Sequence, residues 1–180
     1  MNRIFIVGYM GVGKTTVGKK LAKALGLSFI DLDAHIQSTY RKTIAQLFNE
    51  KGETEFRKLE RNALLELANF ENVVVSTGGG APCFFDNMDL MNNAGITIYI
   101  QAEPDELASR LKASKTVRPL ISDKSPDELL AFITQHLAQR ECYYKKAQFV
   151  YHTNHLVTKK DVNLTVEGIQ EMLKNGQNNV

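Results

Sequence analysis

The apolar positions of this chain form short runs that alternate with segments of helical periodicity. The runs are rich in β-branched residues, which is typical of buried strands, and they occupy 4–7, 28–32, 73–75, 96–100 and 149–152. Between them, apolar residues recur every three or four positions, which predicts helices over 14–25, 53–68, 87–94, 105–111 and 166–173, before a polar tail at 175–180. Strands that alternate with helices indicate a mainly parallel sheet covered on both faces.

Two capping boxes mark further helix starts. Thr43 precedes Gln46 at the required spacing and opens a helix that Gly52 interrupts. Ser125 precedes Glu128, with a proline at the first helical position, and opens a helix that runs toward residue 146. The segment 112–124 has no sustained apolar face, so we expect a mobile loop there.

A glycine-rich segment lies between the first strand and the first helix. Residues 8–15 fit the pattern G-x-x-x-x-G-K-[ST], in which backbone N–H groups and a helix N-terminus converge on a polyphosphate. Lys14 would reach the β- and γ-phosphates, and the Thr15 hydroxyl is placed to ligate Mg²⁺. An ordinary glycine turn is the alternative. The complete pattern, flanked by a strand and a helix, favours a nucleoside triphosphate site.

Composition limits the other possibilities. A chain of 180 residues with 43% hydrophobic and 23% charged residues is ordinary for one soluble domain, here 1–180. A net charge of +2 is too small to indicate a nucleic-acid or membrane partner. Gly8 cuts short the first apolar run, so no signal peptide is expected, and no run is long enough to span a membrane. Cys83 and Cys142 are isolated, which predicts reduced thiols and a cytoplasmic protein.

Two further clusters are candidates for substrate binding. The second strand ends in an acidic pair, Asp31 and Asp33, which share a face if extended and could reach the crevice at the carboxyl ends of the sheet. Alternatively, Asp33 caps a helix that begins at Ala34. Residues 78–80 are three glycines directly after the third strand; they indicate either close approach of a substrate to the backbone or a plain loop.

Six segments together resemble one enzyme family. They are GYMGVGKTT at 8–16, FIDLD at 29–33, GETEFRKLE at 52–60, STGGGAP at 76–82, TVRPLI at 116–121 and QRECYY at 139–144. In this order they resemble shikimate kinases, small P-loop kinases of the nucleoside-monophosphate-kinase type. The resemblance implies a three-layer α/β sandwich with a five-stranded parallel sheet, a mobile lid near 112–124 and a substrate-binding helical region near 33–61. It also implies phosphorylation of the 3-hydroxyl of shikimate by ATP with Mg²⁺, a step of aromatic amino acid biosynthesis.

The resemblance also assigns roles to residues of this sequence. Arg57 and Arg140 would clamp the shikimate carboxylate, which suits the bidentate geometry of guanidinium groups. Asp33 would bind the hydroxyls and accept a proton, Gly79 would contact shikimate, and Asp31 would lie near Mg²⁺ through water. The implied catalytic set is Lys14, Asp33 and Arg118; the implied ATP contacts are Gly11, Val12, Gly13, Lys14, Thr15, Thr16 and Arg118; the implied metal ligands are Thr15 and Asp31.

Some alternatives stay open at this point. Arg57 could be a solvated helix charge paired with Glu53 or Glu60, although under the resemblance Glu60 would hold its side chain. The family often has an arginine beside the adenine near residue 155, where this chain has His155, so that histidine substitutes or the contact is absent. His152 and His155 have no third ligand nearby, which argues against a metal site there.

Two other functions compete with this one. A gluconate-type kinase would use the same scaffold, and a nucleotide-gated binding module or GTPase would use the same loop. The chain has no Asn-Lys-x-Asp sequence for guanine, and Asp33, Arg57 and Arg140 would then be unexplained. We therefore expect ATP and shikimate as partners, no nucleic acid or membrane, and a monomer.

Arg118 offers a test. Within a closing lid it would stabilise the negative charge that spreads over the transferred phosphoryl group, and closure would keep water out. Arg118→Ala should therefore lower the turnover number strongly while the dissociation constant for shikimate stays nearly unchanged. Steady-state kinetics together with a binding titration measure both quantities. An unchanged turnover number would remove Arg118 from the mechanism.

Overall fold

Five parallel strands form the centre of the molecule, which we describe from a computed structural model over residues 3–114, 121, 124–153 and 156–177. The strands are β1 (Arg3–Val7), β2 (Ser28–Asp31), β3 (Val73–Ser76), β4 (Ile96–Gln101) and β5 (Phe149–His152). Their order in the sheet is β2-β3-β1-β4-β5, and every neighbouring pair is parallel. Each predicted strand lies within one residue of an observed one, and the five-stranded parallel sheet is confirmed.

The register of the strands places their carboxyl ends at one edge. Ser76, the last residue of β3, is paired with Ile6 of β1 on one side and with Asp31 of β2 on the other. Val7, the last residue of β1, is level with Tyr99 of β4. The segments that follow β1, β2 and β3 therefore leave the sheet side by side, which is where open α/β sheets bind ligands.

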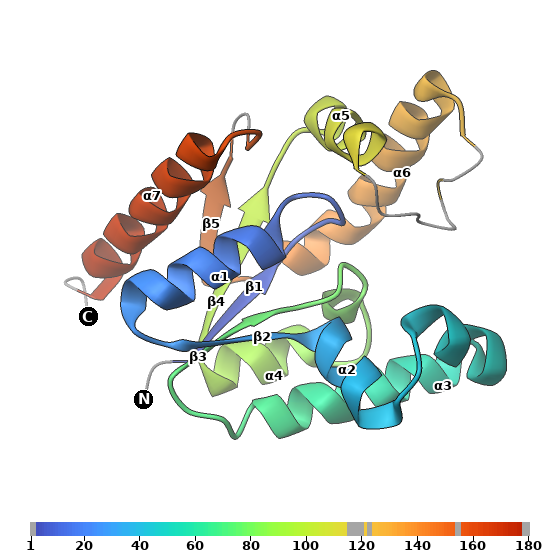
Figure 1. Cartoon of the computed structure of the whole chain (residues 1–180), viewed down its shortest axis with the longest axis horizontal. Coiled ribbons are helices and arrows are strands. Elements are labelled where there is room, and N and C mark those ends of the chain that lie inside the picture. Colours follow the sequence, from blue (N-terminus) through green and yellow to red (C-terminus); the bar gives the residue numbers. More distant parts are fainter. Residues whose placement is uncertain (1–2, 115–120, 122–123, 154–155, 178–180) are drawn as a thin grey trace.

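Helices cover both faces of this sheet (Figure 1). Helices α1 and α7 pack together on one face, and α3 and α4 lie on the other, while α5 and α6 pack against each other near the carboxyl edge. Their bounds are α1 (Lys14–Leu25), α2 (Leu32–Tyr40), α3 (Ile44–Leu67), α4 (Asn87–Ala94), α5 (Pro104–Ala113), α6 (Pro126–Tyr144) and α7 (Lys159–Gln177), with a short 3₁₀ helix η1 (Ala81–Cys83) after β3.

The starts of three helices follow from local side-chain chemistry. The Thr43 hydroxyl accepts from the Gln46 N–H and the Gln46 side chain accepts from the Thr43 N–H, so α3 opens with the predicted capping box. Ser125 opens α6 in the same way. Asp31 caps α2 by accepting from the Ala34 N–H, because the helix begins at Leu32. The alternative that Asp33 is the capping residue is therefore wrong.

Three predicted boundaries are corrected. Helix α5 continues to Ala113, so Lys112 and Ala113 are helical and do not belong to the predicted loop 112–124; most of the rest of that loop, 115–120 and 122–123, lies outside the described residues. Helix α7 begins at Lys159 and extends into the predicted polar tail as far as Gln177. Both ends of α7 are rich in polar residues, so the periodicity of apolar residues does not predict these helical turns. As predicted, the backbone at Gly52 leaves the helical conformation, with a φ of 74°, within α3.

The core lies on both faces of the sheet, as the apolar strands require. Phe5 and Ile6 of β1, Val75 of β3 and Ile98 of β4 are fully buried. Burying such side chains is the main favourable contribution to folding, about 1.5–3 kcal/mol for each. None of the described helices is both long and apolar enough to cross a lipid bilayer.

Candidate active site

The loop between β1 and α1 is built on glycines with positive φ. These are Gly8 at 142°, Gly11 at 81° and Gly13 at 98°. A Cβ on Gly11 would lie 2.8 Å from Cδ2 of Leu111, and a Cβ on Gly13 would lie 2.6 Å from Cδ2 of Leu156. Both the conformation and the close packing therefore require glycine, and the loop is wedged between α1, α5 and the segment after β5.

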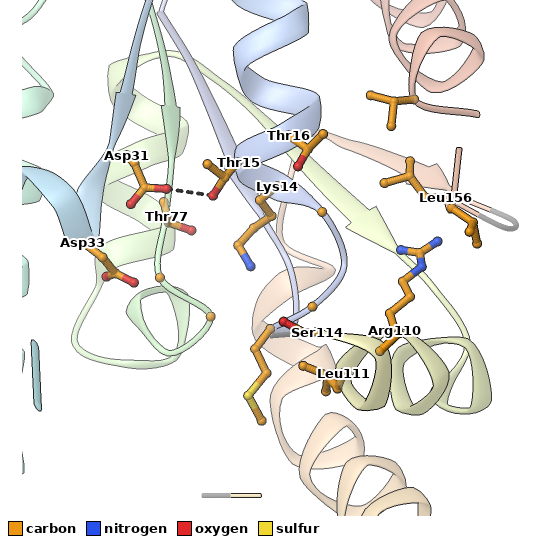
Figure 2. A pocket seen from close by; sticks show the side chains of 18 of the residues that line it. Lys14, Thr15, Thr16, Asp31, Asp33, Thr77, Arg110, Leu111, Ser114 and Leu156 are labelled. Atoms are coloured by element: carbon orange, nitrogen blue, oxygen red, sulfur yellow. Dashed lines mark hydrogen bonds between the residues drawn. The ribbon is translucent and has the colours of Figure 1, made fainter. Parts of the chain in front are cut away.

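Lys14 and Thr15 begin α1 directly after this loop. Lys14 is buried, and its Nζ donates to the carbonyl oxygens of Gly8 at 2.8 Å and Tyr9 at 2.9 Å. The Thr15 hydroxyl donates to Oδ2 of Asp31 at 2.8 Å (Figure 2). The sheet register thus joins a residue after β1 to the last residue of β2.

A cavity of about 660 Å³ lies in front of the loop. Eight predicted site residues line it, Gly79 among them, and Figure 2 shows the side chains of most of the others; those others are Gly11, Gly13, Lys14, Thr15, Thr16, Asp31 and Asp33. Arg57 and Arg140 do not line the cavity. Val12 is buried and does not line the cavity; its backbone carbonyl accepts a hydrogen bond from Arg110. Arg118 lies outside the described residues.

Arg57 is held in a buried cage beside the cavity. It is only 8% exposed, and its Nη1 donates to Oε2 of Glu60 at 2.9 Å, while its Nη2 donates to Oε1 of Glu53 at 3.1 Å. The guanidinium lies 4.1 Å from the ring centroid of Phe84, a cation–π contact. The pairing with both glutamates agrees with the alternative weighed above, but burial contradicts a solvated surface charge.

The three glycines after β3 are closely surrounded by the chain itself. A Cβ on Gly78 would lie 2.9 Å from Oδ1 of Asp33, and a Cβ on Gly80 would lie 2.7 Å from both terminal nitrogens of Arg57. A Cβ on Gly79 would lie 3.2 Å from the backbone nitrogen of Met10. The glycines at 78 and 80 are therefore explained by neighbouring side chains, and only Gly79 among them has the phosphate loop as its closest neighbour.

The Glu60 carboxyl interacts electrostatically with three predicted substrate-binding residues. Its carboxyl is 1% exposed, and burial raises its pKa from 4.5 to about 7, against the opposing attraction of Arg57. The negative charge of Asp33 raises this pKa further, and the positive charge of Arg140 lowers it. Asp33, Arg57 and Arg140 thus each affect the pKa of one carboxyl group, although they come from three separate helices.

Arg110 is a cavity residue that the sequence analysis missed. Its Nη1 donates to the Val12 carbonyl at 3.0 Å, and its Nη2 pairs with Glu106, one turn earlier on α5. Glu106 also accepts from the Leu156 N–H at 3.2 Å. The spacing of Glu106 and Arg110 suggests a helix pair from sequence, but nothing local indicates that the pair faces the phosphate loop. His155, the predicted substitute beside adenine, lies outside the described residues.

The donor atoms near Thr15 fit a magnesium ion. A hydroxyl and a carboxylate are hard oxygen ligands, and Mg²⁺ is commonly bound by one or two protein oxygens together with water and phosphates. Within the described residues no group of three or more histidines, cysteines or acidic residues could hold a metal on its own. Such a metal would therefore need oxygens from a bound phosphate.

Comparison with known proteins decides the family. The shikimate kinase family model matches residues 10–170. The chain belongs to the shikimate kinase family. A curated shikimate kinase of Parabacteroides distasonis is 50% identical over 173 residues, which cover 96% of this chain and 100% of the relative.

Solved shikimate kinases share the fold. The crystal structure of the enzyme from Bacteroides thetaiotaomicron is 48% identical, covers 96% of this chain and 98% of its own, and superposes with a TM-score of 0.93. The enzyme from Acinetobacter baumannii, solved in complex with shikimate, is 32% identical with a TM-score of 0.83, over 97% of this chain and 94% of its own. These shikimate kinases confirm the predicted fold class, family and kinase activity, with ATP as co-substrate.

The raised pKa of Glu60 makes stability depend on pH. Because the pKa of Glu60 in the folded state exceeds its ordinary value, the folded state binds the Glu60 proton more tightly than the unfolded state does. The bound proton therefore stabilises the folded state fully below about pH 4.5, and this stabilisation is lost as the pH rises through about 7. At 1.36 kcal/mol per pKa unit, the loss is about 3 kcal/mol. Glu60→Gln should remove this dependence, so the variant should gain stability relative to the unmodified chain between pH 4.5 and 8.

Urea unfolding across this pH range measures the difference. The matched control is Glu53→Gln. Glu53 is the other carboxylate partner of Arg57, but its side chain is 59% exposed. The control should keep the pH slope of the unmodified chain. Parallel stability profiles for Glu60→Gln and the unmodified chain would contradict the assignment of this proton to Glu60.

Proposed function

We propose that this chain transfers the γ-phosphoryl group of ATP to the 3-hydroxyl of shikimate, with the residue roles set out below. The observation that carries the proposal is the position of the loop 78–80. Gly79 packs on the phosphate loop at Met10, and Gly80 packs on the guanidinium of Arg57. A donor phosphate and an acceptor carboxylate bound at these two places would lie on either side of one short loop.

Arg57 and Arg140 are the proposed carboxylate clamp. Arg57 is already oriented by Glu53, Glu60 and Phe84, so it loses little conformational freedom when a ligand binds. Arg140 is partly exposed and lies near the same Glu60 carboxyl. Two guanidinium groups offer the paired N–H donors that a carboxylate accepts from, and this favours a carboxylate over a neutral sugar.

Asp33 is the proposed partner of the reacting hydroxyl. It stands in the first turn of α2, lines the cavity and lies against Gly78, between the phosphate loop and the Arg57 cage. From there its carboxylate can accept a hydrogen bond from a hydroxyl of the acceptor and take its proton as the new P–O bond forms. Because Asp31 supplies the helix cap, the start of α2 does not require the Asp33 side chain.

The phosphate side is assigned to the start of α1. Lys14 would exchange its two carbonyl contacts for the β- and γ-phosphates, while Gly11, Val12, Gly13 and Thr16 surround the polyphosphate. Thr15 and Asp31 would hold Mg²⁺, Asp31 through water. When bound, this ion would neutralise charge that develops on the phosphate oxygens. Arg118 keeps its predicted role in the lid.

Arg110 is the proposed neighbour of the adenine ring. Its guanidinium is fixed by Glu106 and the Val12 carbonyl, and Leu156 and Val157 provide apolar surface on the same side of the cavity. A flat guanidinium and aliphatic side chains suit the faces of a base. Arg110 would thus supply the arginine that the sequence analysis sought near residue 155.

Transfer would be direct and in line. Positioning and charge stabilisation supply most of the rate in phosphoryl transfer, so no covalent enzyme intermediate is required. A phosphorylated histidine, or retention of configuration at a chiral phosphate, would contradict this. The single domain, the monomeric state and the cytoplasmic location stay predictions.

The test is ADP release in the presence of MgATP. Release should depend on shikimate and should not be supported by gluconate. Arg140→Ala should raise the KM for shikimate about 10- to 100-fold, because charged hydrogen bonds contribute about 1.5–3 kcal/mol. The KM for ATP should stay within about twofold, since Arg140 does not line the nucleotide cavity.

Gly80→Ala is a second variant on the same site. Its Cβ would displace the Arg57 guanidinium, yet the φ of −86° suits any residue, so the backbone should be unaffected. It too should raise the KM for shikimate selectively. Turnover without shikimate, or turnover of gluconate, would argue for one of the alternative functions.

A further inference from the structure

Helix α6 presents three residues, spaced four apart, to the two loops of the site. They are His136, Arg140 and Tyr144, and a spacing of four places them on one helix face. His136 contacts the phosphate loop, and Tyr144 contacts the loop 78–80. Arg140, the proposed carboxylate ligand, is therefore flanked on each side by a contact with one of these loops.

The contact with the phosphate loop is specific. Oη of Tyr9 lies 2.8 Å from Nδ1 of His136, and the two rings meet edge to face with centroids 5.6 Å apart. Tyr9 is 1% exposed, and His136 is packed on its other side by Phe132 at 5.0 Å. Burial and the nearby positive charge of Arg140 lower the pKa of His136, so a neutral imidazole faces the phenol.

The contact with the second loop is equally well defined. The Tyr144 hydroxyl donates to the Gly79 carbonyl at 2.6 Å, and the buried ring packs on Tyr99 of β4 at 5.3 Å. Burial raises the pKa of Tyr144, and the positive charge of Arg140 opposes this shift. Arg140 lies one helical turn before Tyr144, so the helix that carries it is fixed to the sheet at that point.

We propose that Tyr9, His136 and Tyr144 are positioning residues that hold Arg140 in place for the acceptor carboxylate. A long arginine side chain on a helix would otherwise sample many positions, and anchoring the helix at His136 and Tyr144 limits where its guanidinium can lie. The inference rests on the proposed role of Arg140. Tyr9, a residue of the phosphate loop, would then govern affinity for the acceptor.

Tyr9→Phe tests this claim with little change in volume. Loss of one hydrogen bond should raise the KM for shikimate about 3- to 10-fold, while the KM for ATP and kcat stay within about twofold. His136→Leu should have the same effect, and the double variant should be no worse than either single one, because both remove the same contact. His136→Asn should restore much of the affinity, since its amide can occupy the place of Nδ1.

Two further variants separate positioning from general destabilisation. Tyr151→Phe removes a phenol on β5, away from both loops, and should leave all constants unchanged. In an Arg140→Ala background, Tyr9→Phe should add nothing, because its effect passes through Arg140. If Tyr9→Phe fails to fold, Tyr144→Phe takes its place and should raise the KM for shikimate in the same selective way.

The outcomes distinguish this inference from the proposed function. A rise in the KM for ATP alone, equal rises for both substrates, or full additivity of Tyr9→Phe with Arg140→Ala would overturn the positioning role. Shikimate turnover by the unmodified chain would still support the proposed function in those cases. Absence of shikimate turnover by the unmodified chain would refute both.

Discussion

Parallel pairing of β1, β2 and β3 is the constraint on which the site depends. Ser76 is level with both Ile6 and Asp31. The phosphate loop, Asp31 and the loop 78–80 therefore lie next to one another at the carboxyl edge of the sheet. The Thr15–Asp31 hydrogen bond and the packing of Gly79 on Met10 follow from this alignment. A one-residue slip of a strand would turn its buried side chains to the opposite face and separate these groups.

Charge balance in the acceptor half depends on one buried acid. Glu60 orients Arg57 and lies close enough to Asp33 and Arg140 for each to affect its pKa. A buried ion pair contributes little net stability by itself, but it fixes geometry, and breaking it leaves an uncompensated charge. Arg57 also has an aromatic contact and a second carboxylate partner, so its orientation is fixed from several sides.

Helix α6 links the two halves of the site. It contacts the phosphate loop through His136 and the loop 78–80 through Tyr144, and Arg140 lies between these two residues on the helix. Glycine at 79 lets the two loops approach each other closely, which brings both contacts within the span of two helical turns. The proposed nucleotide and acceptor sites are thus connected by direct contacts between protein side chains and loops.

Residue types at fixed local spacing were enough to predict the strands, the capping boxes of α3 and α6, the phosphate loop and the family. The folded chain was needed to show that Asp31 caps α2, that Arg110 faces the phosphate loop, that Glu60 has a raised pKa, and that Tyr9 meets His136. Apart from the local Asp31 cap, these features join residues that lie far apart along the chain or depend on burial. The periodicity of apolar residues along the sequence does not indicate which distant groups will be buried together in a low-dielectric environment.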